Sequence, residues 1–153
     1  MPNTYSQLYI QIVFAVKGRQ NFIIEPYREE LQKYITGIVQ KLDQKMYAIY
    51  CMPDHTHLLV SMKPDLAISD LTGKVKSNSS SWLKKRFTSL SSFAWQEGFG
   101  AFSYSKSQAH NVVNYILNQP EHHKKKTFKQ EYIEFLEKFE IDYDEKYLFE
   151  FYD

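Results

Sequence analysis

The fold is decided by one stretch near the middle of the chain, Met46-Tyr47-Ala48-Ile49-Tyr50-Cys51-Met52-Pro53-Asp54-His55-Thr56-His57-Leu58-Leu59-Val60-Ser61-Met62. Its two halves, residues 46–52 and 55–62, are rich in apolar, aromatic and β-branched side chains, which is typical of strands. Pro53 and Asp54 lie between the halves and favour a tight turn. The stretch therefore predicts an antiparallel β-hairpin.

The segments on either side of the hairpin alternate between helical and strand patterns. A helix is expected where Pro26 precedes apolar residues at helical spacing. A capping box of Thr127 and Gln130 predicts the start of the last helix. The remaining predicted elements are a strand over residues 8–16, a helix capped by Ser69 or Asp70 and ending near Arg86, a strand over 101–105, and a helix over 107–118.

This order of elements predicts an α+β fold. Strand, helix, hairpin, helix, strand and helix follow one another, as in a ferredoxin-like split β-α-β sandwich. We expect a mainly antiparallel sheet with the helices packed on one face. With 153 residues, the chain is long enough for one domain with an appended tail.

Charge and cysteine content indicate which partners and which cellular compartment suit this protein. Residues 1–129 carry 17 Lys and Arg against 9 Asp and Glu, whereas residues 130–153 carry 2 against 9. A basic body could attract a polyanion, although charges that interleave on a solvated surface explain the same numbers. Cys51 is the single cysteine, so an intramolecular disulfide is excluded. Together with the lack of a signal peptide or an apolar span, this favours a cytoplasmic protein without membrane segments.

The first candidate site is the His55-Thr56-His57 motif. Side chains alternate along a strand, so the two imidazoles point to the same side and could share one divalent ion with a third ligand. The alternative is a pair of partly exposed histidines beside a hairpin turn.

The second candidate site is the pair Tyr115 and Gln119, which lie one helical turn apart. A phenol can attack phosphorus and form a covalent phosphotyrosine, and an amide oxygen can complete the shell of a hard metal ion. Tyr115 is also one of twelve tyrosines, and packing on the sheet would explain it equally well.

Two basic groups are candidates for contact with DNA phosphates. A charged helix face and a solvated linker are the respective alternatives. The groups are Lys74, Lys76, Lys84, Lys85 and Arg86 on the second helix, and Lys124 and Lys125 after the tyrosine helix.

Taken together, these motifs resemble the HUH single-tyrosine transposases of small bacterial insertion sequences, which include the REP-associated tyrosine transposases. The resemblance extends from the strand at residues 10–18 through the histidine pair, and continues through residues 95–103 to the helix at 115–119. Thr56 departs from the family, in which a bulky apolar residue usually separates the histidines.

The resemblance implies a role for each motif residue. His55, His57 and Gln119 would bind a catalytic divalent metal, Mg²⁺ or Mn²⁺, and Tyr115 would be the nucleophile. The protein would cleave single-stranded DNA marked by hairpin ends, form a 5′-phosphotyrosine and rejoin strands, as a homodimer and without a nucleotide cofactor. Residues 1–126 would form the catalytic domain, with an acidic C-terminal helix and tail at 127–153.

Two other functions remain open from the sequence. A two-histidine phosphoesterase would need a second His-x-Ser/Thr element, which the sequences after His110 and His123 do not supply. A domesticated, non-catalytic protein that binds DNA hairpins on the same fold would keep the basic surface and lose the reaction.

Overall fold

The computed structural model describes residues 3–18, 23 and 25–151, and they form a four-stranded antiparallel sheet with the order β2-β3-β1-β4. The central hairpin is present as predicted, and the α+β class with an antiparallel sheet is confirmed. The strands are β1 (Tyr9–Ala15), β2 (Lys45–Cys51), β3 (His55–Ser61) and β4 (Gly100–Tyr104).

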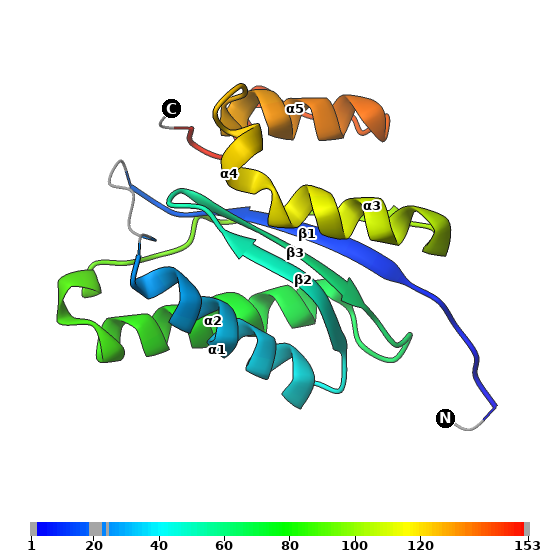
Figure 1. The fold of residues 1–153 in the computed structure, drawn as a ribbon, viewed down its shortest axis with the longest axis horizontal. Coiled ribbons are helices and arrows are strands. Elements are labelled where there is room, and N and C mark those ends of the chain that lie inside the picture. Colours follow the sequence, from blue (N-terminus) through cyan, green and yellow to red (C-terminus); the bar gives the residue numbers. More distant parts are fainter. Residues whose placement is uncertain (1–2, 19–22, 24, 152–153) are drawn as a thin grey trace.

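Helices cover both faces of this sheet, which corrects the expectation of helices on one face. Figure 1 shows α1 and α2 on one side of the sheet and α3 and α5 on the other. The short α4 links α3 to α5. The helices are α1 (Tyr27–Lys41), α2 (Ile68–Arg86), α3 (Lys106–Leu117), α4 (Gln119–His122) and α5 (Phe128–Lys138), with short 3₁₀ turns at Thr88–Leu90 and Glu145–Tyr147.

The composition of β3 explains the two-sided packing. Every residue of this strand except Ser61 is buried, and neighbouring side chains point to opposite faces. Leu58 contributes to the large core on the α1 and α2 side. Leu59 packs with Val112 and Ile116 of α3 in a second, smaller core on the other side. A strand that is buried on both faces needs helices on both faces. The unbroken apolar run at residues 58–60 indicates such a strand in the sequence.

The two predicted helix caps had different outcomes. The Thr127 side chain accepts a hydrogen bond from the Gln130 backbone N–H, and the Gln130 side-chain oxygen accepts one from the Thr127 backbone N–H, so the capping box is confirmed. The predicted cap of α2 at Ser69 or Asp70 is wrong, because the N-cap residue is Ala67. The helix begins earlier because Ile68 packs against the core, and this packing outweighs the preference for a polar cap.

The C-terminal tail packs onto α5 and onto the end of β1. Phe149 is buried and lies 4.9 Å from the ring of Tyr132. The Gln96 side chain donates to the Glu150 carbonyl at 2.8 Å and accepts from the Glu150 amide at 2.7 Å. The residues beyond α5 therefore belong to the same packed structure as the sheet.

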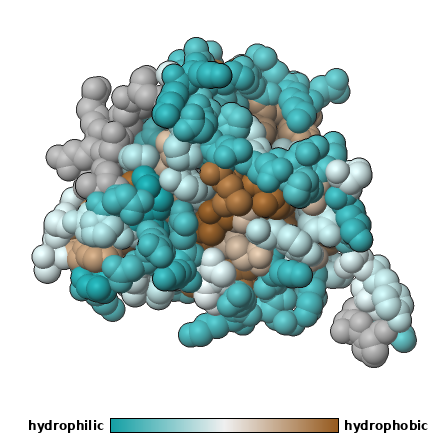
Figure 2. Space-filling model, in the orientation of Figure 1, coloured by the Kyte–Doolittle hydropathy of each residue, from teal (hydrophilic) through white to brown (hydrophobic). Residues whose placement is uncertain are grey.

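The surface is mainly hydrophilic. In the view of Figure 2, apolar side chains gather near the middle of the molecule, where the sheet lies between the two helical layers. None of the helices in the described part of the chain combines the length and hydropathy needed to cross a bilayer.

Gly100 tests the packing of α5 on the sheet. A Cβ at this position would lie 2.8 Å from the Tyr132 hydroxyl oxygen and 2.9 Å from its Cε1 atom, and Tyr132 is itself buried. We expect Gly100→Ala to lower the free energy of unfolding by about 1–3 kcal/mol, the usual cost of overpacking. Urea denaturation would measure this change.

Gly73→Ala is the matched control, because nothing lies within 4 Å of a Cβ at this helical position. This substitution should raise the stability by about 0.4–1 kcal/mol, since alanine restricts the unfolded chain. Equal effects of the two substitutions would mean that Tyr132 does not pack over Gly100.

Candidate active site

The predicted site residues converge on the sheet face that α3 and α5 cover. His55 and His57 project from β3 on the same face, as the strand alternation predicted, and both are fully buried. Tyr115 reaches the cluster from α3, and Gln119 reaches it from the start of α4. The alternative of partly exposed histidines is therefore wrong.

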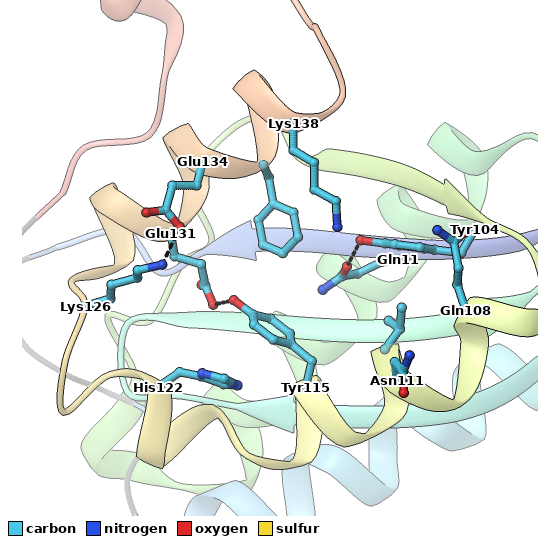
Figure 3. Close-up of a pocket in the computed structure, with 12 residues that line it drawn as sticks. Gln11, Tyr104, Gln108, Asn111, Tyr115, His122, Lys126, Glu131, Glu134 and Lys138 are labelled. Atoms are coloured by element: carbon cyan, nitrogen blue, oxygen red, sulfur yellow. Dashed lines mark hydrogen bonds and ion pairs between the residues drawn. The ribbon is translucent and has the colours of Figure 1, made fainter.

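Glu131 of α5 is the centre of this cluster, and the sequence analysis did not select it. Its Oε1 atom lies 2.9 Å from His57 Nε2 and 3.6 Å from His55 Nε2. Its Oε2 atom accepts a hydrogen bond from Gln119 Nε2 at 3.0 Å and another from the Tyr115 hydroxyl. Figure 3 shows the Tyr115 and Glu131 side chains meeting across the gap between α3 and α5. One carboxylate thus connects both histidines to the candidate nucleophile.

Contacts outside the cluster fix the orientation of His55. Its Nδ1 atom donates to Asp54 Oδ1 at 2.7 Å, which leaves Nε2 facing the cluster. The ring of Phe128 stacks on the imidazole with centroids 3.9 Å apart. Carboxylates that accept from the outer nitrogen of a metal-binding histidine serve the same purpose in known metal sites.

A different pair of side chains orients His57. Gln11 of β1 places its Nε2 atom 2.9 Å from His57 Nδ1. The hydroxyl of Tyr104 in turn donates to Gln11 Oε1 at 2.9 Å. The Nε2 atoms of both histidines are thereby directed at Glu131.

The electrostatics of the cluster favour an ionised carboxylate beside a neutral imidazole. Burial would raise the pKa of Glu131, but the imidazoles of His57, His123 and His55 outweigh burial and hold it far below its usual value. Burial lowers the pKa of His57, and Glu131 offsets this only in part. Burial would lower the pKa of His123, but its hydrogen bond to Glu131 and the negative charges of Glu131 and Asp54 together outweigh burial and raise it.

Tyr115 is held as a neutral phenol by the same surroundings. Burial raises its pKa first, and the Glu131 carboxylate raises it further. A phenol attacks phosphorus far more readily as the phenolate, so this site needs added positive charge to act at neutral pH.

The donor set suits a divalent metal ion. One ligand atom each from His55, His57 and Glu131 lie within 4.8 Å of one another, and all three residues are buried. The Gln119 Oε1 atom is 3.2 Å from His55 Nε2, so the predicted amide ligand lies beside the other three donors. Two imidazoles with carboxylate and amide oxygens form a mixed nitrogen and oxygen set that accepts several first-row divalent ions.

The sequence contained a signal for Glu131. It lies between Phe128 and Tyr132, and four residues before Phe135, on the apolar face of the predicted last helix. A carboxylate on a buried helix face must be paired, so its position indicates a functional or structural partner. His123, which was also not predicted, approaches the cluster from the end of α4, with its Nε2 atom 3.0 Å from Gln119 Oε1.

Thr56, the departure from the usual motif, lies outside the cluster. It points to the opposite face of the sheet from the histidines and is fully buried in register with Cys51. The substitution therefore changes the α1 and α2 core and leaves the ligand set unaltered.

The basic residues of α2 lie on the other side of the sheet from this cluster (Figure 1). Lys74, Lys84 and Lys85 are exposed there. Lys76 is only partly exposed and donates to the backbone carbonyls of Gln96 and Gly98 at 2.6 and 2.8 Å, so its ammonium group stabilises the loop before β4.

Three other predicted basic residues have different surroundings. Arg86 pairs with Glu30 of α1 at 3.2 Å. Lys124 pairs with Glu121 at 3.1 Å and, like the exposed Lys125, directly follows α4. These two lysines are near the cluster in the chain, whereas the α2 residues are separated from it by the sheet.

Comparisons with known proteins found a matching family model and similar transposases. Residues 4–119 match the family model described as "Transposase IS200 like". Over 118 residues, the chain is 26% identical to the ISDra2 transposase TnpA of Deinococcus radiodurans, an alignment that covers 74% of this chain and 84% of that protein. It is 25% identical over 118 residues to the transposase for insertion sequence element IS200 of Salmonella typhimurium, covering 74% and 77%.

Two solved structures share the fold. A putative transposase from Deinococcus radiodurans superimposes with a TM-score of 0.64 at 21% identity, covering 76% of this chain and 94% of that one. A REP-associated tyrosine transposase bound to a REP hairpin gives a TM-score of 0.61 at 16% identity, covering 79% and 72%.

Glu131→Gln tests the ligand set. The substitution keeps the shape of the side chain and removes its charge, so we expect Mn²⁺ affinity to fall by at least about tenfold, as for other changes around bound metals. The measurement is the rise in melting temperature when Mn²⁺ is added, because an ion that binds only the folded state stabilises that state. Glu137→Gln, at an exposed position of the same helix, is the control. An unchanged rise in the Glu131 variant would remove this residue from the ligands.

Proposed function

Because this chain belongs to the family of IS200-like transposases, we propose that it cleaves and rejoins single-stranded DNA with Tyr115 as the nucleophile. One observation carries the proposal. The Tyr115 hydroxyl donates a hydrogen bond to Glu131, whose other oxygen contacts His57 in a buried cluster. Tyr115 is one of twelve tyrosines in the chain, and its phenol is hydrogen-bonded to a candidate metal ligand.

His55, His57, Glu131 and Gln119 would hold a divalent cation, Mg²⁺ or Mn²⁺. When bound, the cation would polarise the scissile phosphate and offset the charge that develops in the transition state. Asp54 and Gln11 would keep the two imidazoles in position for this role. No nucleotide cofactor is needed, because a phosphotyrosine conserves the energy of the broken bond.

Glu131 Oε2 orients the Tyr115 hydroxyl by accepting its hydrogen bond, and the low pKa of this carboxyl leaves water as the proposed acceptor of the phenol proton. The phenol oxygen then bonds to phosphorus, the bond from phosphorus to the 3′-oxygen breaks, and the leaving 3′-oxygen takes a proton from water. The products are a 5′-phosphotyrosine and a 3′-hydroxyl. Rejoining is the reverse reaction with the 3′-hydroxyl of a second strand, and the phenol recovers its proton. Gln119 supports this arrangement because its amide nitrogen donates to the same oxygen of Glu131 at 3.0 Å.

The proposed substrate is single-stranded DNA next to a hairpin. A solved relative by fold is bound to a REP hairpin, which supports hairpin binding here. At the C-terminal end of α2, the rings of Tyr34 and Trp82 stack at 4.4 Å beside Lys85 and Arg86. Aromatic rings next to cations are well suited to DNA, so this end of α2 is the proposed hairpin contact.

A homodimer in the cytoplasm is the proposed assembly. Tyr115 and His57 approach within one chain, with ring centroids 6.1 Å apart. Each protomer would therefore contain a complete set of catalytic groups.

Tyr115→Phe should abolish the covalent link to DNA and leave hairpin binding nearly unchanged. The test mixes the protein with labelled DNA from the regions that flank the gene, adds Mg²⁺ or Mn²⁺, and looks for a shifted band on a denaturing gel. Tyr147→Phe is the matched control, because this phenol is exposed in the C-terminal tail and should be dispensable for the link. Tyr104→Phe is measured beside it as the rival nucleophile, because this second phenol lines the same cleft as Tyr115.

Each outcome of this experiment identifies a function. An adduct that persists in Tyr115→Phe and is lost in Tyr104→Phe would transfer the nucleophile role to Tyr104. Hairpin binding by the wild type without any adduct would favour the alternative, a domesticated DNA-binding protein without the reaction.

Lys85→Ala tests the hairpin contact. If Lys85 neutralises one phosphate, the slope of log affinity against log salt should become shallower by about 1, and binding should weaken for all hairpin sequences alike. Lys41→Ala at the opposite end of α1 is the control, with the slope of the wild type. A slope unchanged by Lys85→Ala would place the hairpin elsewhere on the surface.

A further inference from the structure

A cleft extends from the candidate nucleophile along the gap between α3 and α5. Its volume is about 380 Å³. Tyr115 lines it between His122 and Asn111, and Gln11 and Tyr104 line it from the sheet (Figure 3). The volume is near the lower end of the roughly 300–1,000 Å³ range of small-molecule sites, enough for one base with its sugar.

The walls of the cleft combine flat rings with hydrogen-bonding amides. Tyr104, Tyr115, His122 and Phe135 contribute the rings, and the Tyr115 and His122 rings lie 4.4 Å apart. Rings of this kind stack with any nucleobase. Asn111 contributes an amide that has both a donor and an acceptor, which can pair with the edge of a base.

The charges inside the cleft favour a base over a phosphate group. Glu131 and Glu134 both line it, and carboxylates repel phosphate oxygens. Lys126 lies 2.6 Å from Glu134 and is already paired. Lys138 extends from α5 towards Gln11 and Tyr104 at the other side of the cleft (Figure 3). A neutral ring can therefore occupy the part of the cleft beside Asn111, while the scissile phosphate lies at the Tyr115 hydroxyl, where a bound cation would offset the repulsion from Glu131.

We propose that this cleft binds one unpaired nucleotide of single-stranded DNA, the nucleotide that adjoins the scissile phosphate, with its base between the aromatic walls and beside Asn111. The proposal rests on the proposed function, because Tyr115 must be the nucleophile for the neighbouring nucleotide to lie here. Most of one wall comes from α5, which lies beyond the residues that match the family model. The cleft is therefore a feature of this chain rather than of the matched segment.

The test combines a change in the protein with a change in the DNA. Asn111 is exposed, so Asn111→Trp should fold normally while its indole fills the cleft. Asn114→Trp is the matched control, with the same substitution three residues further along the same helix, at an exposed position outside the cleft. The DNA is a set of cleavable strands in which one nucleotide at a time, on either side of the cleavage point, is replaced by an abasic residue.

We expect one abasic position next to the cleavage point to slow adduct formation by the wild type and by Asn114→Trp by about tenfold, the usual scale for loss of one stacked base. The same abasic position should have no further effect on Asn111→Trp, because the indole already occupies the site. Equilibrium binding in the Tyr115→Phe background is measured in parallel, so that a slowly reacting variant still gives a result.

The possible failures are distinguishable. If the wild type forms no metal-dependent adduct with any strand, the proposed function fails. If the adduct forms but the abasic residue has the same effect on Asn111→Trp as on Asn114→Trp, or has no effect at either neighbouring position, the nucleotide site is wrong and the proposed function is retained.

Discussion

The buried carboxylate of Glu131 is the interaction on which the rest of the site depends. It accepts hydrogen bonds from an imidazole, an amide and a phenol that come from different parts of the chain. An ionised carboxylate away from water is tolerated only when such partners surround it. The strand, the tyrosine helix and the C-terminal helix are therefore held together by the group that joins the chemistry of the site.

The two faces of β3 have separate tasks. His55 and His57 face the cluster around Glu131, while Thr56 and Leu58 face the large core. A slip of one residue in the pairing would exchange these two sets, so a change of register would also bury imidazoles in an apolar core. The packing of the core thus protects the geometry of the candidate metal ligands.

Much of the fold and part of the site follow from the sequence, because they depend on local patterns. The hairpin of residues 46–62, the capping box of Thr127 and the shared orientation of the histidines all follow from spacing and turn chemistry. The start of α2 depends on contacts between distant residues, and propensity alone does not determine it. The composition of β3 indicated cover on both faces, but it did not say which helices provide it. The position of Glu131 on the apolar face of its helix indicated a buried partner, but the identity of that partner did not follow, since His57 is 74 residues away in the sequence.

The distance in sequence between β3 and α5 has a consequence for the order of events during synthesis. The sheet has all its strands once Tyr104 has emerged from the ribosome, and domains generally fold from the N-terminus as they appear. Glu131 emerges later, and Phe149, which packs on the ring of Tyr132, emerges later still. A nascent chain can therefore hold a finished sheet with the histidines in place while the cluster around Glu131 is incomplete, so the candidate site forms only after the C-terminal residues have been translated.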